Sequence, residues 1–138
     1  MEAKEILTPK NMFLALGTTV IVMSFYGMAN GDEWAEYGWG EDNVLAHDEA
    51  YEEMWALHLM PLGVMAMITG MVVTGKELAR MAIFSPVVLV ILAVGMTVLA
   101  SDNGYSTDPP GGISGILGGI MMIAVILTCA SGFMHKDE

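Results

Sequence analysis

The chain has 138 residues, the length of a single domain, and 54% of them are hydrophobic. Its mean hydropathy of +0.56 is too high for an ordinary soluble core and places the chain in the membrane class. A formal net charge of −11 excludes nucleic acid as a partner, because the phosphates would repel the protein.

Four apolar segments are long enough to cross a bilayer, which takes roughly 20 residues at about 1.5 Å each. We therefore expect an all-α integral membrane protein, a single domain over residues 1–138 built as a four-transmembrane-helix bundle. The spans are expected at about residues 11–30, 54–75, 81–101 and 112–134. The connection between the second and third spans is short, which predicts that these two helices are antiparallel neighbours.

The basic residues predict the orientation, because cytoplasmic loops retain Lys and Arg. All five precede the first span, separate the second from the third, or follow the fourth: Lys4, Lys10, Lys76, Arg80 and Lys136. The loops at residues 31–53 and 102–110 hold eleven acids and no base. We expect a multi-pass protein of the cell or inner membrane, with both termini cytoplasmic and the acidic loops outside.

The end of the first acidic loop has helical spacing, with apolar and aromatic residues on one face and carboxylates on another. The first face is formed by Val44, His47, Tyr51, Met54 and His58, and the second by Asp48, Glu49, Glu52 and Glu53. The second helix is therefore expected to begin before the membrane, near Val44.

Two histidines on this face are candidate metal ligands. His47 and His58 are eleven residues apart, about 16 Å along a helix, so they cannot share one ion. Met54 and His58 would suit copper, and His47 with Asp48 or Tyr51 would suit a harder ion. His58 with a methionine at the same end would suit haem iron. The alternative is structural: no cofactor, with His58 hydrogen-bonded at the membrane interface and His47 in water.

Aromatic residues among the acids predict a docking surface for a basic partner outside the membrane, since interfaces favour large aromatic side chains. The residues proposed for it are Trp34, Tyr37, Trp39, Glu52 and Glu53. Solvation of the loop and weak binding of a divalent cation are the alternatives.

Glycines recur every four residues at the start of the fourth span, at Gly111, Gly115 and Gly119. Such spacing lets helix backbones approach closely in lipid, where little hydrophobic force acts between helices. The face is expected to pack on a helix, which belongs either to this chain or to another subunit.

The sequence offers no nucleophile paired with a base, no phosphate-binding glycine loop and no ionisable residue in a span core. It predicts a non-catalytic accessory or structural subunit whose partners are other integral membrane subunits and the bilayer. The architecture resembles the small multi-span subunits that accompany haem-copper oxidases or copper membrane monooxygenases, which implies a respiratory or oxidising complex. The alternatives are a metal- or haem-binding protein using His58, or a small oligomeric channel lined by Thr18, Thr69 and Thr97.

Overall fold

A computed structural model describes residues 3–108 and 110–138, and in these residues the chain is helical, without strands. The elements are α1 (Ala3–Ile6), α2 (Pro9–Ala29), α3 (Gly31–Trp39), the short 3-10 helix η1 (Glu41–Asn43), α4 (Asp48–Val72), α5 (Gly75–Asn103) and α6 (Gly112–His135). Four of them, α2, α4, α5 and α6, are long and apolar enough to cross a membrane. The predicted all-α fold with four spanning helices is confirmed at this level.

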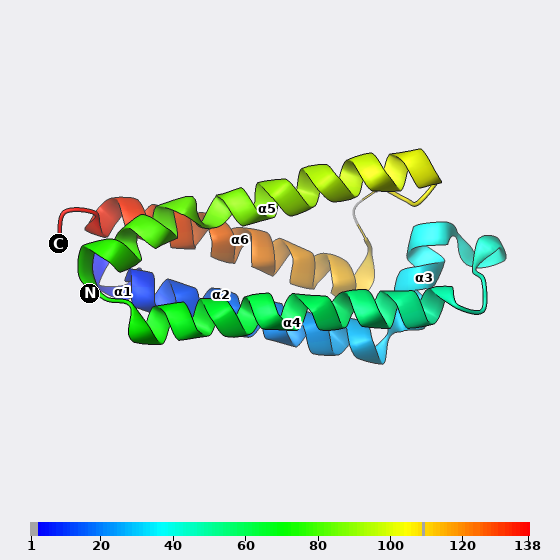
Figure 1. The fold of residues 1–138 in the computed structure, drawn as a ribbon, viewed down its shortest axis with the longest axis horizontal. Coiled ribbons are helices and arrows are strands. Elements are labelled where there is room, and N and C mark those ends of the chain that lie inside the picture. Colours follow the sequence, from blue (N-terminus) through cyan, green and yellow to red (C-terminus); the bar gives the residue numbers. More distant parts are fainter. Residues whose placement is uncertain (1–2, 109) are drawn as a thin grey trace.

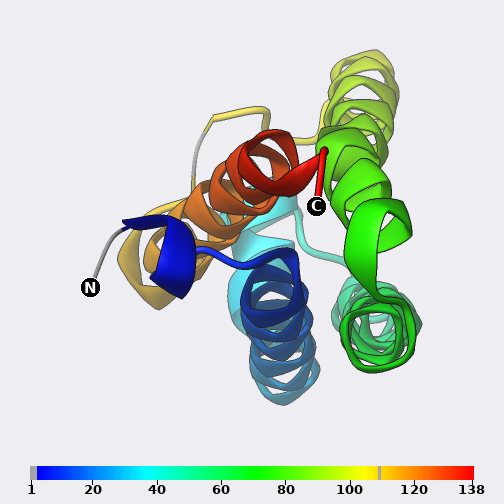
Figure 2. The same cartoon turned by 90° about the vertical axis from the view of Figure 1, so that its left-hand side faces the viewer.

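The four long helices lie lengthwise beside one another, and both chain termini lie at the same end of the bundle (Figure 1). We call this the terminal end; it also holds the turn between α4 and α5. The opposite end holds α3, η1 and the connection from α5 to α6, and we call it the acidic end (residues 30–53 and 102–111). Viewed along the bundle, the helices surround the axis with α2 and α4 as one neighbouring pair and α5 and α6 as the other (Figure 2).

Two helix starts differ from the sequence prediction, and one further helix was not expected. Helix α4 begins at Asp48 rather than Val44, because the backbone N–H of Leu45 donates to Asp48 Oδ2 at 2.8 Å and forms a turn there. Helix α5 begins at Gly75, six residues earlier than expected. Gly75 has a positive φ of 61° and ends the turn from α4. Helix α3 was expected as loop. The acidic end is therefore more ordered than its charge suggested.

The α2 and α4 helices cross at a pair of glycines. A Cβ atom added to Gly17 would lie 2.6 Å from the carbonyl oxygen of Gly63, and one added to Gly63 would lie 2.8 Å from that of Gly17. Nearer the acidic end, Ser24 Oγ donates to the carbonyl oxygen of Ala56 at 2.7 Å. Bare backbone and one interhelical hydrogen bond therefore hold this pair together, as small and polar residues do in membranes.

The glycines predicted to pack are not the ones that do so within this chain. An added Cβ would meet nothing within 4 Å at Gly111 and Gly119, and at Gly115 it would meet only the carbonyl group of Pro110, just before the same helix. In the described part of the chain this face contacts no other helix. Packing of this face on a helix of another subunit stays a prediction.

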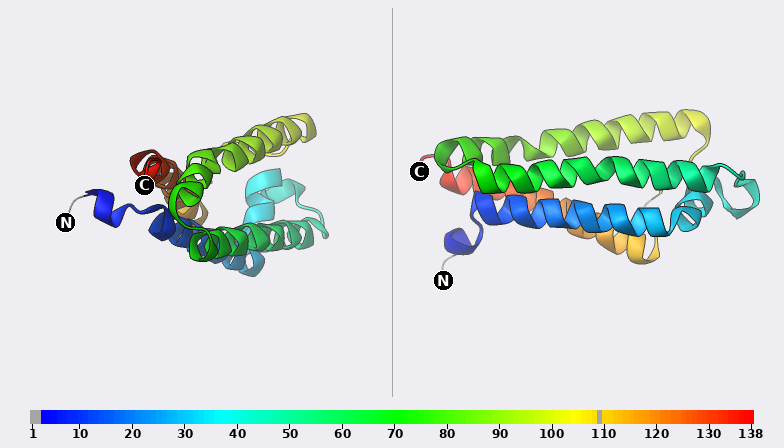
Figure 3. Two further views of the ribbon diagram at one scale, coloured as in Figure 1. Left: turned by 60° about the vertical axis from the view of Figure 1, so that its left-hand side comes forward. Right: turned by 60° about the horizontal axis from the view of Figure 1, so that its bottom comes forward.

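Helices α4 and α5 are antiparallel, as expected, but they are neighbours only near their turn. From there α5 diverges from α4 towards the acidic end, and it packs mainly on α6 (Figure 3). Its apolar residues are largely exposed, among them Val90, Ile91 and Val94.

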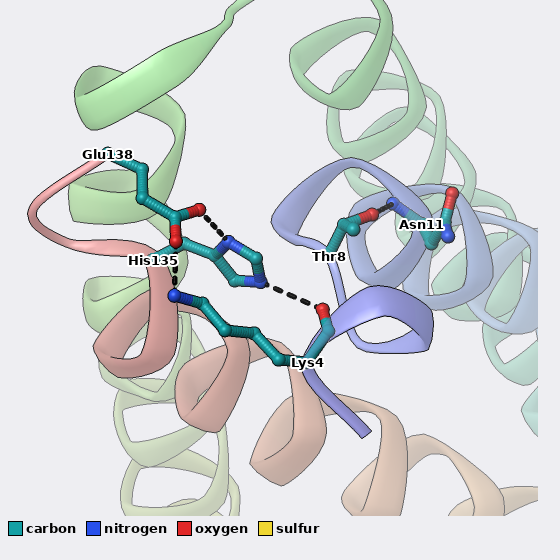
Figure 4. Close-up of polar contacts among 5 residues, drawn as sticks. All are labelled: Lys4, Thr8, Asn11, His135 and Glu138. Atoms are coloured by element: carbon teal, nitrogen blue, oxygen red, sulfur yellow. Dashed lines mark hydrogen bonds and ion pairs between the residues drawn. The ribbon is translucent and has the colours of Figure 1, made fainter. Parts of the chain in front are cut away.

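The two termini are joined by a polar clasp at the terminal end (Figure 4). Lys4 Nζ forms an ion pair with Glu138 Oε1, and His135 Nδ1 lies 2.6 Å from Glu138 Oε2. The other ring nitrogen of His135 lies 3.1 Å from the carbonyl oxygen of Lys4. Hydrogen bonds from Lys4 and His135 lower the pKa of the Glu138 carboxyl below its usual range. The ionised carboxylate is therefore the form that holds the clasp.

We expect the clasp to open in acid. A carboxyl whose pKa is lowered by folding contributes stability above its unfolded pKa, about 4.5, and loses it as the pH falls through the lower folded value. The protection factors of residues 3–7, which compare measured amide exchange with the intrinsic rate at the same pH, should therefore fall below about pH 4.5 in the native chain. Glu138→Gln should show low protection at every pH, whereas Asp137→Asn should behave as the native chain. Protection that changes neither with pH nor in Glu138→Gln would contradict the clasp.

Candidate functional site

Helix α3 folds back onto the bundle through a buried tryptophan. Trp34 is only 8% exposed, and its Nε1 donates to Ser114 Oγ on α6 at 3.1 Å. The indole lies against Gly27 of α2, where an added Cβ would be 2.5 Å from the ring. Helix α3 thus covers the ends of two spanning helices that are far apart in sequence.

A single carboxylate completes this network. Glu33 Oε1 accepts a hydrogen bond from Ser114 Oγ at 3.0 Å, and Glu33 Oε2 accepts one from Tyr26 Oη at 2.6 Å. Both carboxylate oxygens therefore have a partner inside the chain. Three helices, α2, α3 and α6, are connected through Glu33 although no basic residue is involved.

A second cluster joins α3, α4 and the connection from α5 to α6. Tyr105 Oη donates to Glu52 Oε1 at 2.9 Å, and the Tyr105 ring meets Trp39 edge-to-face with centroids 5.1 Å apart. The ring lies directly on Gly38, where no Cβ would fit, and the Ser106 N–H donates to the Gly38 carbonyl oxygen at 2.7 Å. Burial, and then the neighbouring Glu52 carboxylate, raise the pKa of Tyr105. The phenol is therefore a stable hydrogen-bond donor at neutral pH.

Two of the five predicted docking residues are used inside the chain. Trp34 and Glu52 are each 8% exposed, so their side chains are not available to a flat partner surface. Tyr37, Trp39 and Glu53 are half-buried and do reach the surface. The hydroxyl of Tyr37 is buried without a hydrogen-bond partner among the described residues. The docking prediction is therefore reduced to the outer parts of these three side chains.

Each of the two candidate histidines lies next to a residue that the sequence prediction pairs with it. His58 is exposed, and its Nδ1 lies 2.5 Å from the backbone carbonyl oxygen of Met54, the hydrogen bond that the structural alternative predicts. His47 is exposed too, with Nε2 3.6 Å from Asp48 Oδ1 and its ring against that of Tyr51.

Residues 3–108 and 110–138 contain no group of three or more His, Cys, Asp or Glu side chains that could hold a metal ion. A copper or haem site at His58 would therefore need ligands of another kind or from another chain, and it stays a prediction.

A buried hydroxyl and a half-buried thiol of α6 are used for helix packing. Thr128 Oγ1 donates to the carbonyl oxygen of Ala124 at 2.7 Å and approaches that of Met12 on α2 at 3.4 Å. Cys129 Sγ lies 3.5 Å from the carbonyl oxygen of Ile83 on α5. Backbone carbonyl oxygens thus accept hydrogen bonds from this hydroxyl and this thiol, which would otherwise be candidate nucleophiles.

Comparison with known proteins does not place the chain in a family. No protein-family model, no curated protein and no solved structure matches it. A function for the chain is therefore inferred from its own residues and their geometry.

Proposed function

We propose that the chain is a non-catalytic accessory subunit of a larger membrane protein complex. The observation that carries the proposal is the open glycine face of α6, where Gly111 and Gly119 would accommodate a Cβ without meeting any atom within 4 Å. Glycine lowers helix stability by about 1 kcal/mol relative to alanine, so a row of them favours a packing role. A helix of another subunit is the partner that fits, because close backbone contact is a principal source of helix association in lipid.

The distribution of charge supports an orientation with the terminal end in the cytoplasm. All five bases lie at or near that end, whereas eleven acids lie at the acidic end. Placed outside, the half-buried side chains of Tyr37, Trp39 and Glu53 form an acidic and aromatic surface for a basic partner. The architectural resemblance favours a respiratory complex or a copper- or haem-containing oxidising complex as the assembly.

Gentle purification of the native protein, followed by identification of stoichiometric companions, tests the proposal. Gly119→Leu should release companions while leaving the isolated chain folded, because the added side chain meets open space within the chain. Circular dichroism and thermal unfolding in detergent would confirm the fold.

Gly95→Leu on α5 is the matched control, since Gly95 also faces open space within the chain. Recovery of the native protein as a lone monomer would overturn the accessory role. Companions retained after Gly119→Leu would show that the glycine face is not the interface.

A further inference from the structure

Helix α5 diverges from α4 towards the acidic end (Figure 3). A groove of about 480 Å³ is lined there by residues of α2, α4, α5 and α6. Its walls are apolar. Among the residues that line it only Thr69 and Ser85 carry a hydroxyl group and only Trp55 an N–H group, and Ser85 Oγ already donates to the carbonyl oxygen of Ala82. The groove therefore suits a hydrocarbon ligand.

The groove is elongated along α4. Its lining on this helix runs from Trp55 to Thr69, about 21 Å at 1.5 Å per residue. A volume of about 480 Å³ spread over that length suits one extended hydrocarbon chain.

At the acidic end the groove continues into a second cavity of about 280 Å³, which we call the mouth. The two cavities share Trp55 and Met96. The lining of the mouth is mixed: Met96, Leu99 and Ala100 are apolar, whereas Trp39, Tyr51, Glu52, Trp55, Asn103 and Tyr105 carry hydrogen-bonding groups. An apolar channel that ends in a mouth with one carboxylate is the shape of a site for an amphiphile.

The charge of the mouth selects the head group. Glu52 lines it, and Tyr105 donates to only one of the two carboxylate oxygens. The sequence has no Lys or Arg between Lys10 and Lys76, nor between Arg80 and Lys136, so the chain supplies neither of these residues near this end. An ammonium group would donate to the carboxylate and be attracted to the surrounding aromatic rings. An anionic head group would be repelled.

We propose that this groove binds a membrane lipid with an ammonium head group, with one acyl chain between α4 and α5 and the head between Glu52 and the aromatic side chains of the mouth. Because the bilayer is as apolar as the groove, burial of the chain gives little selectivity. The head group therefore decides which lipid is held.

The test uses quenching of tryptophan fluorescence by brominated acyl chains in nanodiscs made mainly of phosphatidylglycerol. The probe is an equal small fraction of brominated phosphatidylethanolamine or of brominated phosphatidylglycerol. Trp55 lines the groove, buried Trp34 lies outside it, and Trp39 lines only the mouth, so quenching should fall strongly in Trp55→Phe and persist only at Trp39. We expect roughly tenfold preferential occupancy by the ethanolamine lipid, the effect of one charge-assisted hydrogen bond.

Two pairs of variants separate the head from the chain. Glu52→Gln should abolish the preference between the two lipids, and Glu53→Gln should retain it. Ala93→Phe, which fills the groove, should reduce quenching by both probes, and Val94→Phe, outside the groove lining, should not. Equal quenching of the native protein by the two lipids would overturn the head-group assignment. Equal quenching of Ala93→Phe and Val94→Phe would overturn occupation of the groove by a chain.

Discussion

Replacing Gly17 by alanine is expected to destabilise the folded bundle by about 1–3 kcal/mol, the usual range for overpacking a well-packed site. The new Cβ would lie 2.5 Å from the Met67 side chain and 2.6 Å from the Gly63 carbonyl oxygen. The side chain of Met67 can move, but the backbone of α4 can yield only if the two helices separate. Gly17→Leu should prevent the α2–α4 contact altogether. Chemical unfolding in detergent, followed by circular dichroism, measures the change.

Gly119→Ala is the control for this experiment, since both changes add one methyl group to a glycine of a spanning helix. At Gly119 the methyl group meets no atom within 4 Å, so the isolated chain should be as stable as the native chain or slightly more stable. Equal destabilisation by both changes would mean that helix propensity or lipid contact, rather than the α2–α4 crossing, sets the stability.

Replacing Trp34 by alanine should lower the free energy of unfolding by about 3–5 kcal/mol, the range for removing a large buried aromatic side chain. The change removes an indole that is 8% exposed and leaves Ser114 without its donor. The remaining bond from Ser114 to Glu33 would then be exposed to water, and α3 would lose its main attachment to α6. Thermal unfolding and amide exchange across Gly31–Trp39 would both report the loss.

Trp39→Ala is the matched control, because it removes the same side chain from the same helix at a half-buried position. Its ring forms an edge-to-face pair with that of Tyr105, and such pairs contribute about 0.5–1.5 kcal/mol beyond burial. The effect should therefore be clearly smaller than that of Trp34→Ala. An equal effect would show that Trp34 does not anchor α3.

The sequence predicts the spanning helices because their signal is local. An apolar run of about 20 residues can satisfy its backbone in lipid only as a helix or within a barrel, so length and hydropathy suffice. The start of α5 at Gly75 does not follow from hydropathy, because Lys76, Glu77 and Arg80 interrupt the apolar run and predict a loop. Charged residues are equally compatible with a first helical turn.

Helix α3 was missed for a different reason. Its buried residues, Gly31, Trp34, Ala35 and Gly38, follow helical spacing. The many carboxylates around these residues predict a solvated loop. Two of the four buried residues are glycines, which add little to the hydrophobic pattern of a helix face. The partners of this helix, Ser114 and Tyr105, come from the far end of the sequence. No local pattern connects them to it.

The spacing of glycines along a helix does not predict which of them contact another helix. Gly111, Gly115 and Gly119 form a regular four-residue repeat, yet Gly17 and Gly63, which meet at the crossing, belong to no such repeat. Whether a glycine is needed depends on what lies opposite. That information belongs to the tertiary structure, and a repeat within one helix does not contain it.

The pairing of the helices also bears on how the chain is made. Helices α2, α3 and α4 are consecutive, so the glycine crossing can form during synthesis as soon as α4 has been translated, before α5 and α6 exist. The α5–α6 hairpin then packs on α2 and α4, which are already in contact. The hydrogen bond from Trp34 to Ser114 can form only at this last step. In a nascent chain stopped after residue 74, α2 and α4 should therefore already be packed together. Helix α3 would still lack its contact with α6.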